Sequence, residues 1–233
     1  MSKNVKTHSI ANRARLHAAL GDESRLAIAE ELRFSDRSPT ELAQRLGVKS
    51  NLLAHHLDVL EDADAIDRVV SAGDARRRYV RLTAAAVEVM GPPETLGQRS
   101  VLFLCTRNSA RSQLAAAVWR ARTGRPARSA GTHPAAAVHP GAVAAAKRLG
   151  ASLDNVVPSA VGLVPRGVQV ITVCDLVHEE LEPRDDWWHW SIPAPSASKK
   201  STAFDAVIDE LNERMTRIGV PTVPGRQGKV ERR

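Results

Sequence analysis

The feature that most constrains the fold of this 233-residue chain is an apolar run that leads directly into a cysteine. Val101–Leu104 precede Cys105, and a helical pattern opens at Arg111. Consecutive apolar residues predict a buried strand, whereas residues 113–122 follow the pattern of an amphipathic helix. The sequence therefore predicts a strand, a short polar loop and a helix, with Cys105 at the end of the strand.

The loop between Cys105 and Arg111 has the composition of an anion-binding site. Backbone N–H groups at a helix N-terminus can surround a tetrahedral oxyanion, and a planar guanidinium can bind two of its oxygens. The same surroundings stabilise a thiolate, so Cys105 is a candidate nucleophile with Arg111 as its catalytic partner. The alternative is a buried structural cysteine. The predicted anion-binding residues are Thr106, Arg107, Asn108, Ser109, Ala110, Arg111 and Ser112.

Within this loop two side chains have more specific expected roles. Ser112 can donate its hydroxyl to the thiolate, and Asn108 can brace the loop from inside. Residues 101–112 resemble the phosphate loop of the low-molecular-weight protein tyrosine phosphatases and of the arsenate reductases with the same fold. The resemblance extends over residues 99–220 through four further segments, which are Ser129–Thr132, His139–Pro140, Val170–Asp175 and His189–Pro193.

Two departures from that family bear on activity. The phosphatases place a general acid in a late Asp-Pro pair, but this chain has Ala194-Pro195, and such an acid is typically worth about a hundred- to ten-thousand-fold in rate. Asp185 and Asp186 are possible substitutes, although solvated loop charges are the favoured interpretation. Cys174 is a possible redox residue, or else a small buried residue at a strand end. The second resolving cysteine of some arsenate reductases is missing, so reduction would need an external thiol.

The N-terminal part predicts a winged helix-turn-helix. Two short helices flank Gly47, with Thr40 as the expected cap of the first and residues 50–60 forming the second. Alternating residues 66–70 and 78–82 around a Gly-Asp turn predict a β-hairpin, the wing. Residues 10–90 resemble the ArsR-type winged-helix repressors. That resemblance implies a homodimer that binds double-stranded DNA.

The expected DNA-binding residues lie on the second helix and the wing. Leu53, Leu57 and Leu60 form an apolar stripe, so the opposite face is free for the major groove. The residues on that face are Lys49, Ser50, Asn51 and His55, and those on the wing are Arg76, Arg77 and Arg78. Asn51 could read adenine, whereas the wing arginines suit phosphate contacts. His56 is expected to pack inside the domain.

Composition and charge bear on DNA binding, on membrane insertion and on the cellular compartment. The net charge of +7 is compatible with DNA binding but does not locate it. No apolar run approaches the roughly 18 residues that span a bilayer, and two cysteines form no disulfide framework. We therefore expect a cytoplasmic protein without membrane contact, metal or cofactor. The sequence holds no evident cluster of metal ligands.

Gly91-Pro92-Pro93 marks the expected boundary between two domains. The prediction is a winged helix over residues 1–92, an α/β domain with a doubly wound parallel sheet over 98–220, and a basic tail over 221–233. The favoured function is a DNA-binding regulator whose second domain binds phosphate, arsenate or a phosphorylated ligand. The alternative is an active phosphatase or arsenate reductase whose winged helix serves to dock or dimerise.

Overall fold

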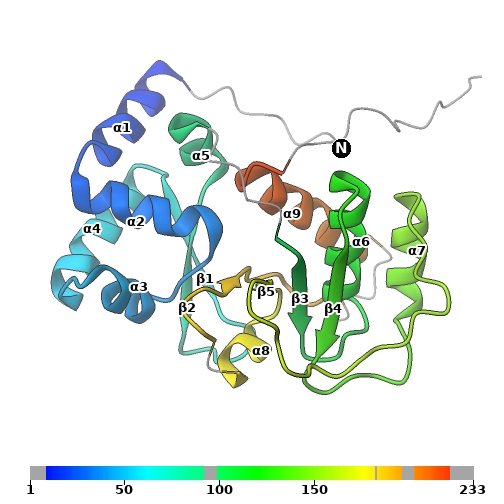
Figure 1. Ribbon diagram of the computed structural model, residues 1–233. Helices are drawn as coiled ribbons and strands as arrows, with labels where there is room; N and C mark the ends of the chain where they lie inside the picture. Colours follow the sequence, from blue (N-terminus) through cyan, green and yellow to red (C-terminus); the bar gives the residue numbers. More distant parts are fainter. Residues whose placement is uncertain (1–8, 92–98, 182, 196–201, 221–233) are drawn as a thin grey trace, which may run out of the picture.

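The computed structural model describes residues 9–91, 99–181, 183–195 and 202–220. Its helical N-terminal half and its sheet-based C-terminal half lie side by side, and the hairpin of β1 and β2 runs between them (Figure 1). The first half contains α1 (Ile10–Leu20), α2 (Glu23–Phe34), α3 (Pro39–Leu46), α4 (Ser50–Asp62), β1 (Ile66–Val70), β2 (Arg78–Leu82) and α5 (Ala84–Met90). The second contains β3 (Val101–Cys105), α6 (Arg111–Thr123), β4 (Ala127–Gly131), α7 (Pro140–Arg148), β5 (Gln169–Thr172), α8 (Asp175–Glu180), β6 (Trp188–His189) and α9 (Ala203–Arg217).

Local sequence explains the helix-turn-helix. Ser38 and Glu41 form a capping box at the start of α3, with Pro39 at the first helical position. The cap is therefore Ser38 and not Thr40, because proline is well placed directly after a cap, where its missing N–H costs no hydrogen bond. Gly47 ends α3 in the left-handed conformation, with φ of 63°. The turn into α4 follows from these two residue choices.

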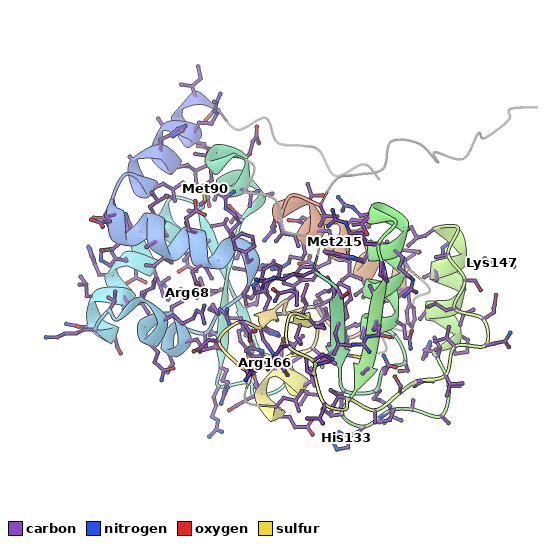
Figure 2. The ribbon with its side chains drawn as sticks, viewed as in Figure 1. Arg68, Met90, His133, Lys147, Arg166 and Met215 are labelled. Atoms are coloured by element: carbon purple, nitrogen blue, oxygen red, sulfur yellow. The ribbon has the colours of Figure 1, made fainter. Side chains whose placement is uncertain are left out.

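The predicted apolar stripe of α4 faces the winged-helix core. Leu53, Leu57 and Leu60 are all buried, packed with residues of α1, α2 and both strands of the wing. Met90 of α5 packs against this core, whereas Met215 of α9 lies in the separate core of the second half (Figure 2). Helix α5 was not predicted, because its seven residues are too few for a clear helical pattern.

The second half is organised by a parallel sheet of order β4-β3-β5-β6, which confirms the predicted α/β fold class. All five residues of β3 are buried, as their continuous apolar character requires. Because β3 and β5 are parallel neighbours, with Leu104 paired to Thr172, their carboxyl ends lie at one edge of the sheet. Cys105 ends β3 and Cys174 follows β5, so the fold brings both cysteines to that edge.

A short segment after α2 joins the two halves. Asp36 N–H donates to the carbonyl of His189 at 2.7 Å, and Arg37 forms an antiparallel bridge with Val80 of the wing. The segment thus hydrogen-bonds to β6 on one side and to β2 on the other. A buried ion pair between Asp36 and Arg214 of α9 lies beside it. The boundary residues 92–98 and the tail 221–233 lie outside the described residues.

Candidate functional site: the anion loop and the DNA-binding face

Three carbonyl groups of the loop after β3 are bonded to the segment that follows β4. Residues 133, 135 and 139 donate backbone N–H groups to the carbonyls of Thr106, Arg107 and Ser109, at 2.8, 2.9 and 2.8 Å. No N–H group of residues 106–110 donates a hydrogen bond within the described part of the chain. Helix α6 begins at Arg111 without a side-chain cap. The loop therefore presents unpaired backbone donors at a helix N-terminus, where an anion binds favourably.

Buried polar side chains fix the shape of this loop. Cys105 Sγ lies 3.0 Å from Ser112 Oγ, which also accepts from the Asn108 amide at 2.9 Å. Asn108 is fully buried, adopts a left-handed φ of 47°, and accepts from the Ser159 N–H at 2.9 Å. Gly131 packs so closely that an added Cβ would overlap the Thr106 carbonyl. Ser112 therefore contacts the Cys105 sulfur, and Asn108 contacts both Ser112 and Ser159. These are the contacts that their expected roles require.

Arg111 connects the loop to two later segments. Its guanidinium donates to the Ile192 carbonyl at 2.8 Å and to Cys174 Sγ at 3.0 Å. Thr106 Oγ1 lies 3.3 Å from the same sulfur. Both cysteines are free and buried. The fold thus places Cys174 beside the loop of residues 106–110, the anion loop, and the Arg111 guanidinium bonds both Cys174 and the Ile192 segment.

The possible substitutes for a general acid lie elsewhere. Asp185 is paired with Arg45 of α3, at 3.8 Å, and Asp186 with Arg184, at 3.6 Å. Both aspartates are exposed, as expected of solvated loop charges. Ala194 is two residues after Ile192, whose carbonyl binds Arg111. The segment with the missing acid therefore reaches the anion loop. His133 lies beyond the carboxyl ends of β3 and β4 (Figure 2).

The residues predicted to bind DNA are on exposed surfaces of α4 and the wing. The exposed residues of this set are Lys49, Ser50, Asn51, His55, Arg76, Arg77 and Arg78. His56 is buried, with its Nδ1 3.9 Å from Asp22. The wing arginines border a cavity of about 560 Å³ between α3 and α8, so the second half lies directly beside the DNA-binding module.

Sequence reasoning missed a group of polar residues between the two halves, in which Glu41 is half-buried and the others are buried. His178 Nε2 lies 3.0 Å from Glu41 Oε1, and His189 Nε2 lies 3.1 Å from Asp175 Oδ1. The two imidazoles are stacked, with centroids 4.1 Å apart, and Thr172 Oγ1 approaches both. Burial lowers the pKa of His178, with a further contribution from the charge of His189. Local patterns give no signal for these pairs, because His178 and Glu41 are 137 positions apart.

Comparison with known proteins agrees with this architecture. The model for the low molecular weight phosphotyrosine protein phosphatases matches residues 100–220, and a helix-turn-helix domain model matches residues 20–69. The chain belongs to the low molecular weight phosphotyrosine protein phosphatase family. Both resemblances drawn from the sequence, including the one to the ArsR-type winged helix, are confirmed.

The curated relatives include arsenate reductase 2 of Bacillus cereus, which is 32% identical over 128 residues. That alignment covers 52% of this chain and 94% of the relative. Among solved structures, an arsenate reductase from Archaeoglobus fulgidus is 25% identical, with 51% and 98% of the two chains covered and a TM-score of 0.43. Reduced HlyU from Vibrio cholerae is 23% identical, with 34% and 83% covered and a TM-score of 0.31.

The helix-turn-helix region indicates a DNA-binding regulator, and the second domain indicates phosphatase-like or arsenate reductase-like chemistry. Among the described residues, no helix is both long and apolar enough to cross a membrane. The same residues contain no group of three side chains arranged to hold a metal ion.

Proposed function

We propose that this protein is a DNA-binding transcriptional regulator whose second domain binds phosphate, arsenate or a phosphorylated ligand. The observation that carries the proposal is the loop of residues 106–110, whose carbonyls all accept hydrogen bonds while its N–H groups have no partner among the described residues. Unpaired N–H groups at a helix N-terminus favour an external anion as their acceptor. Arg111 supplies the positive charge.

The proposal assigns DNA binding to a winged helix over residues 1–92, and anion binding to residues 98–220. The exposed side chains of α4 enter the major groove, and the wing arginines contact phosphates. A homodimer would match two half-sites of an operator. Both thiols stay reduced in the cytoplasm, which is the proposed site of action.

The test of anion binding is calorimetric titration of the whole protein with inorganic phosphate and with arsenate. Arg111→Met should weaken binding by about tenfold or more, because a hydrogen bond to a charged group contributes about 1.5–3 kcal/mol. Arg125→Met is the matched control, since this exposed arginine lies just beyond the far end of α6. Equal affinities in the wild type and Arg111→Met would refute the proposal.

A second candidate is arsenate reduction, which the position of Cys174 favours. The Cys105 thiolate would displace one oxygen of arsenate as water and form a sulfur–arsenic(V) bond. Attack of the Cys174 thiolate on the Cys105 sulfur would then form a disulfide and leave both bonding electrons on arsenic, which departs as arsenite. An external dithiol would reduce the disulfide. The relatives named arsenate reductase support this candidate.

Arsenite formation in the presence of dithiothreitol distinguishes the two candidates. A reductase should produce arsenite, and Cys174→Ser should abolish production while arsenate still binds. No arsenite with any thiol donor would leave the loop with a binding role. Phosphatase activity needs its own assay, because Ala194→Asp should raise turnover of phosphotyrosine by about a hundredfold if the missing acid limits it.

A further inference from the structure

Helix α8 lies between the anion loop and the wing. It begins at Asp175, directly after Cys174, and spans six residues, which is about 9 Å along the helix axis. Figure 1 shows it beside the lower end of the hairpin formed by β1 and β2. Groups from both halves of the molecule surround α8. A movement of α8 would therefore alter its contacts with both halves.

Two carboxylates of α8 accept hydrogen bonds from the wing. The Asp175 carboxylate accepts the N–H of Ala72 at 2.7 Å. The Glu179 carboxylate accepts from Ser71 Oγ at 2.7 Å and from the Tyr79 hydroxyl at 3.1 Å. Ser71 in turn accepts the N–H groups of the two residues at the wing turn, at 2.9 and 3.2 Å. The turn that precedes the wing arginines is thus bonded directly to α8.

This contact leaves little room for movement of the wing alone. A Cβ added to Gly73 would overlap the Glu179 carboxylate and lie 3.3 Å from the backbone nitrogen of Leu176. Tyr79 is fully buried, and its ring centroid lies 4.6 Å from that of His189. A displacement of α8 would therefore move the wing as well, because closely packed groups have few voids between them that could absorb the movement.

The start of α8 also meets the anion loop. Cys174 is the residue before α8, and its sulfur accepts from the Arg111 guanidinium and lies 3.3 Å from the Thr106 hydroxyl. Arg111 also holds the carbonyl of Ile192, three residues after His189 of β6. An oxyanion bound by Arg111 would compete for the same guanidinium. Oxyanion binding would therefore weaken the contacts of Arg111 to Cys174 and Ile192.

We infer that α8 couples the anion loop to the wing, so that oxyanion binding at Arg111 changes the DNA affinity of the wing arginines. This inference rests on the proposed anion binding. The coupling is reciprocal, because a ligand that alters DNA affinity by some factor has its own affinity altered by DNA by the same factor. Such couplings typically amount to fivefold or more.

The single tyrosine of the chain provides a direct probe. In full-length protein labelled with ¹³C-tyrosine, the ring signal of Tyr79 should shift during titration with inorganic phosphate. The midpoint should match the dissociation constant from calorimetry. Saturating phosphate should also change the affinity for a random-sequence duplex by about fivefold or more, relative to sodium chloride at matched ionic strength.

Glu179→Ala tests whether the coupling between the anion loop and the wing passes through α8. This variant removes the acceptor of Ser71 and Tyr79 but leaves the anion loop intact, so phosphate should bind with unchanged affinity while the Tyr79 signal and the DNA affinity no longer respond. Glu180→Ala is the matched control on the same helix, because the contacts of Glu180 within the described part of the chain are to Thr132 and His133 and not to the wing. The control should keep both responses.

The outcomes separate the coupling from the proposed function. Phosphate binding in the wild type without a Tyr79 shift, and with DNA affinity constant within twofold, would overturn the coupling alone. Responses that persist in Glu179→Ala would overturn the route through α8. Absence of phosphate and arsenate binding by calorimetry would overturn the proposed function and the coupling with it.

Discussion

Glu41 illustrates how one residue serves both a helix and a domain interface. One of its carboxylate oxygens accepts the Ser38 N–H at 2.7 Å in the capping box, and the other faces His178 at 3.0 Å. Burial opposes its ionisation, but the hydrogen bond and charge of His178 and the two bonds from Ser38 outweigh burial and lower the pKa of Glu41 to about 2. The ionised carboxylate therefore stabilises the folded protein.

The sign of the resulting pH dependence follows from linkage. Because the folded pKa of Glu41 is below its ordinary value of 4.5, its contribution is fully present above pH 4.5 and is lost as the pH falls toward 2. Glu41→Gln should lower the free energy of unfolding by up to about 3 kcal/mol at pH 7. The difference from wild type should shrink between pH 5 and pH 3 in urea titrations. Glu88→Gln, an exposed glutamate of α5, is the control. A difference independent of pH would contradict the assignment.

At the scale of elements, the wing is bonded to its neighbours through its turn and through β2. Its turn is bonded to α8, its strand β2 is bridged to Arg37, and Arg217 of α9 donates to the carbonyl of Leu82 at 2.5 Å. The arginine-rich end is exposed. Because hydrogen bonds fix the base of the wing, the arginines can contact phosphates without a large loss of conformational entropy in the wing backbone.

Replacing Arg76, Arg77 and Arg78 together with alanine should weaken DNA binding on any sequence. Each phosphate contact adds about 0.9 to the slope of log affinity against log salt, so the slope should fall by about 2–3. Fluorescence anisotropy at several salt concentrations measures both effects. The control is the triple alanine variant of three exposed arginines in the second half, which are Arg125, Arg128 and Arg166. A wild-type slope in the wing variant would show that the wing does not contact DNA.

At the scale of the whole molecule, buried charges join the two halves. Asp36 is fully buried, pairs with Arg214, and accepts the Ser191 N–H at 2.8 Å. The charge of Asp36 raises the pKa of Arg214 despite the opposing effect of burial. A buried charge that loses its partner is strongly destabilising. The interface therefore depends on both members of the pair.

Asp36→Ala should lower the free energy of unfolding by about 3–5 kcal/mol, because Arg214 would be left as a buried, partly uncompensated charge. Calorimetry should show one cooperative transition for the wild type. Asp205→Ala breaks the exposed pair with Arg148 and should cost at most about 1 kcal/mol. Two separate wild-type transitions, with neither altered by Asp36→Ala, would mean that the halves are thermodynamically independent.

The sequence by itself determined the strand into Cys105, the helix-turn-helix and the wing. The apolar run into Cys105, the glycine at position 47 and the alternation of the wing each act within a few residues, so short patterns predict them. The tertiary structure alone decided which groups meet across the chain. The contacts of Cys174 with Arg111, of α8 with the wing, and of Asp36 with Arg214 join residues 63 to 178 positions apart. No local pattern encodes such pairs, because they depend on how two separately formed cores pack together.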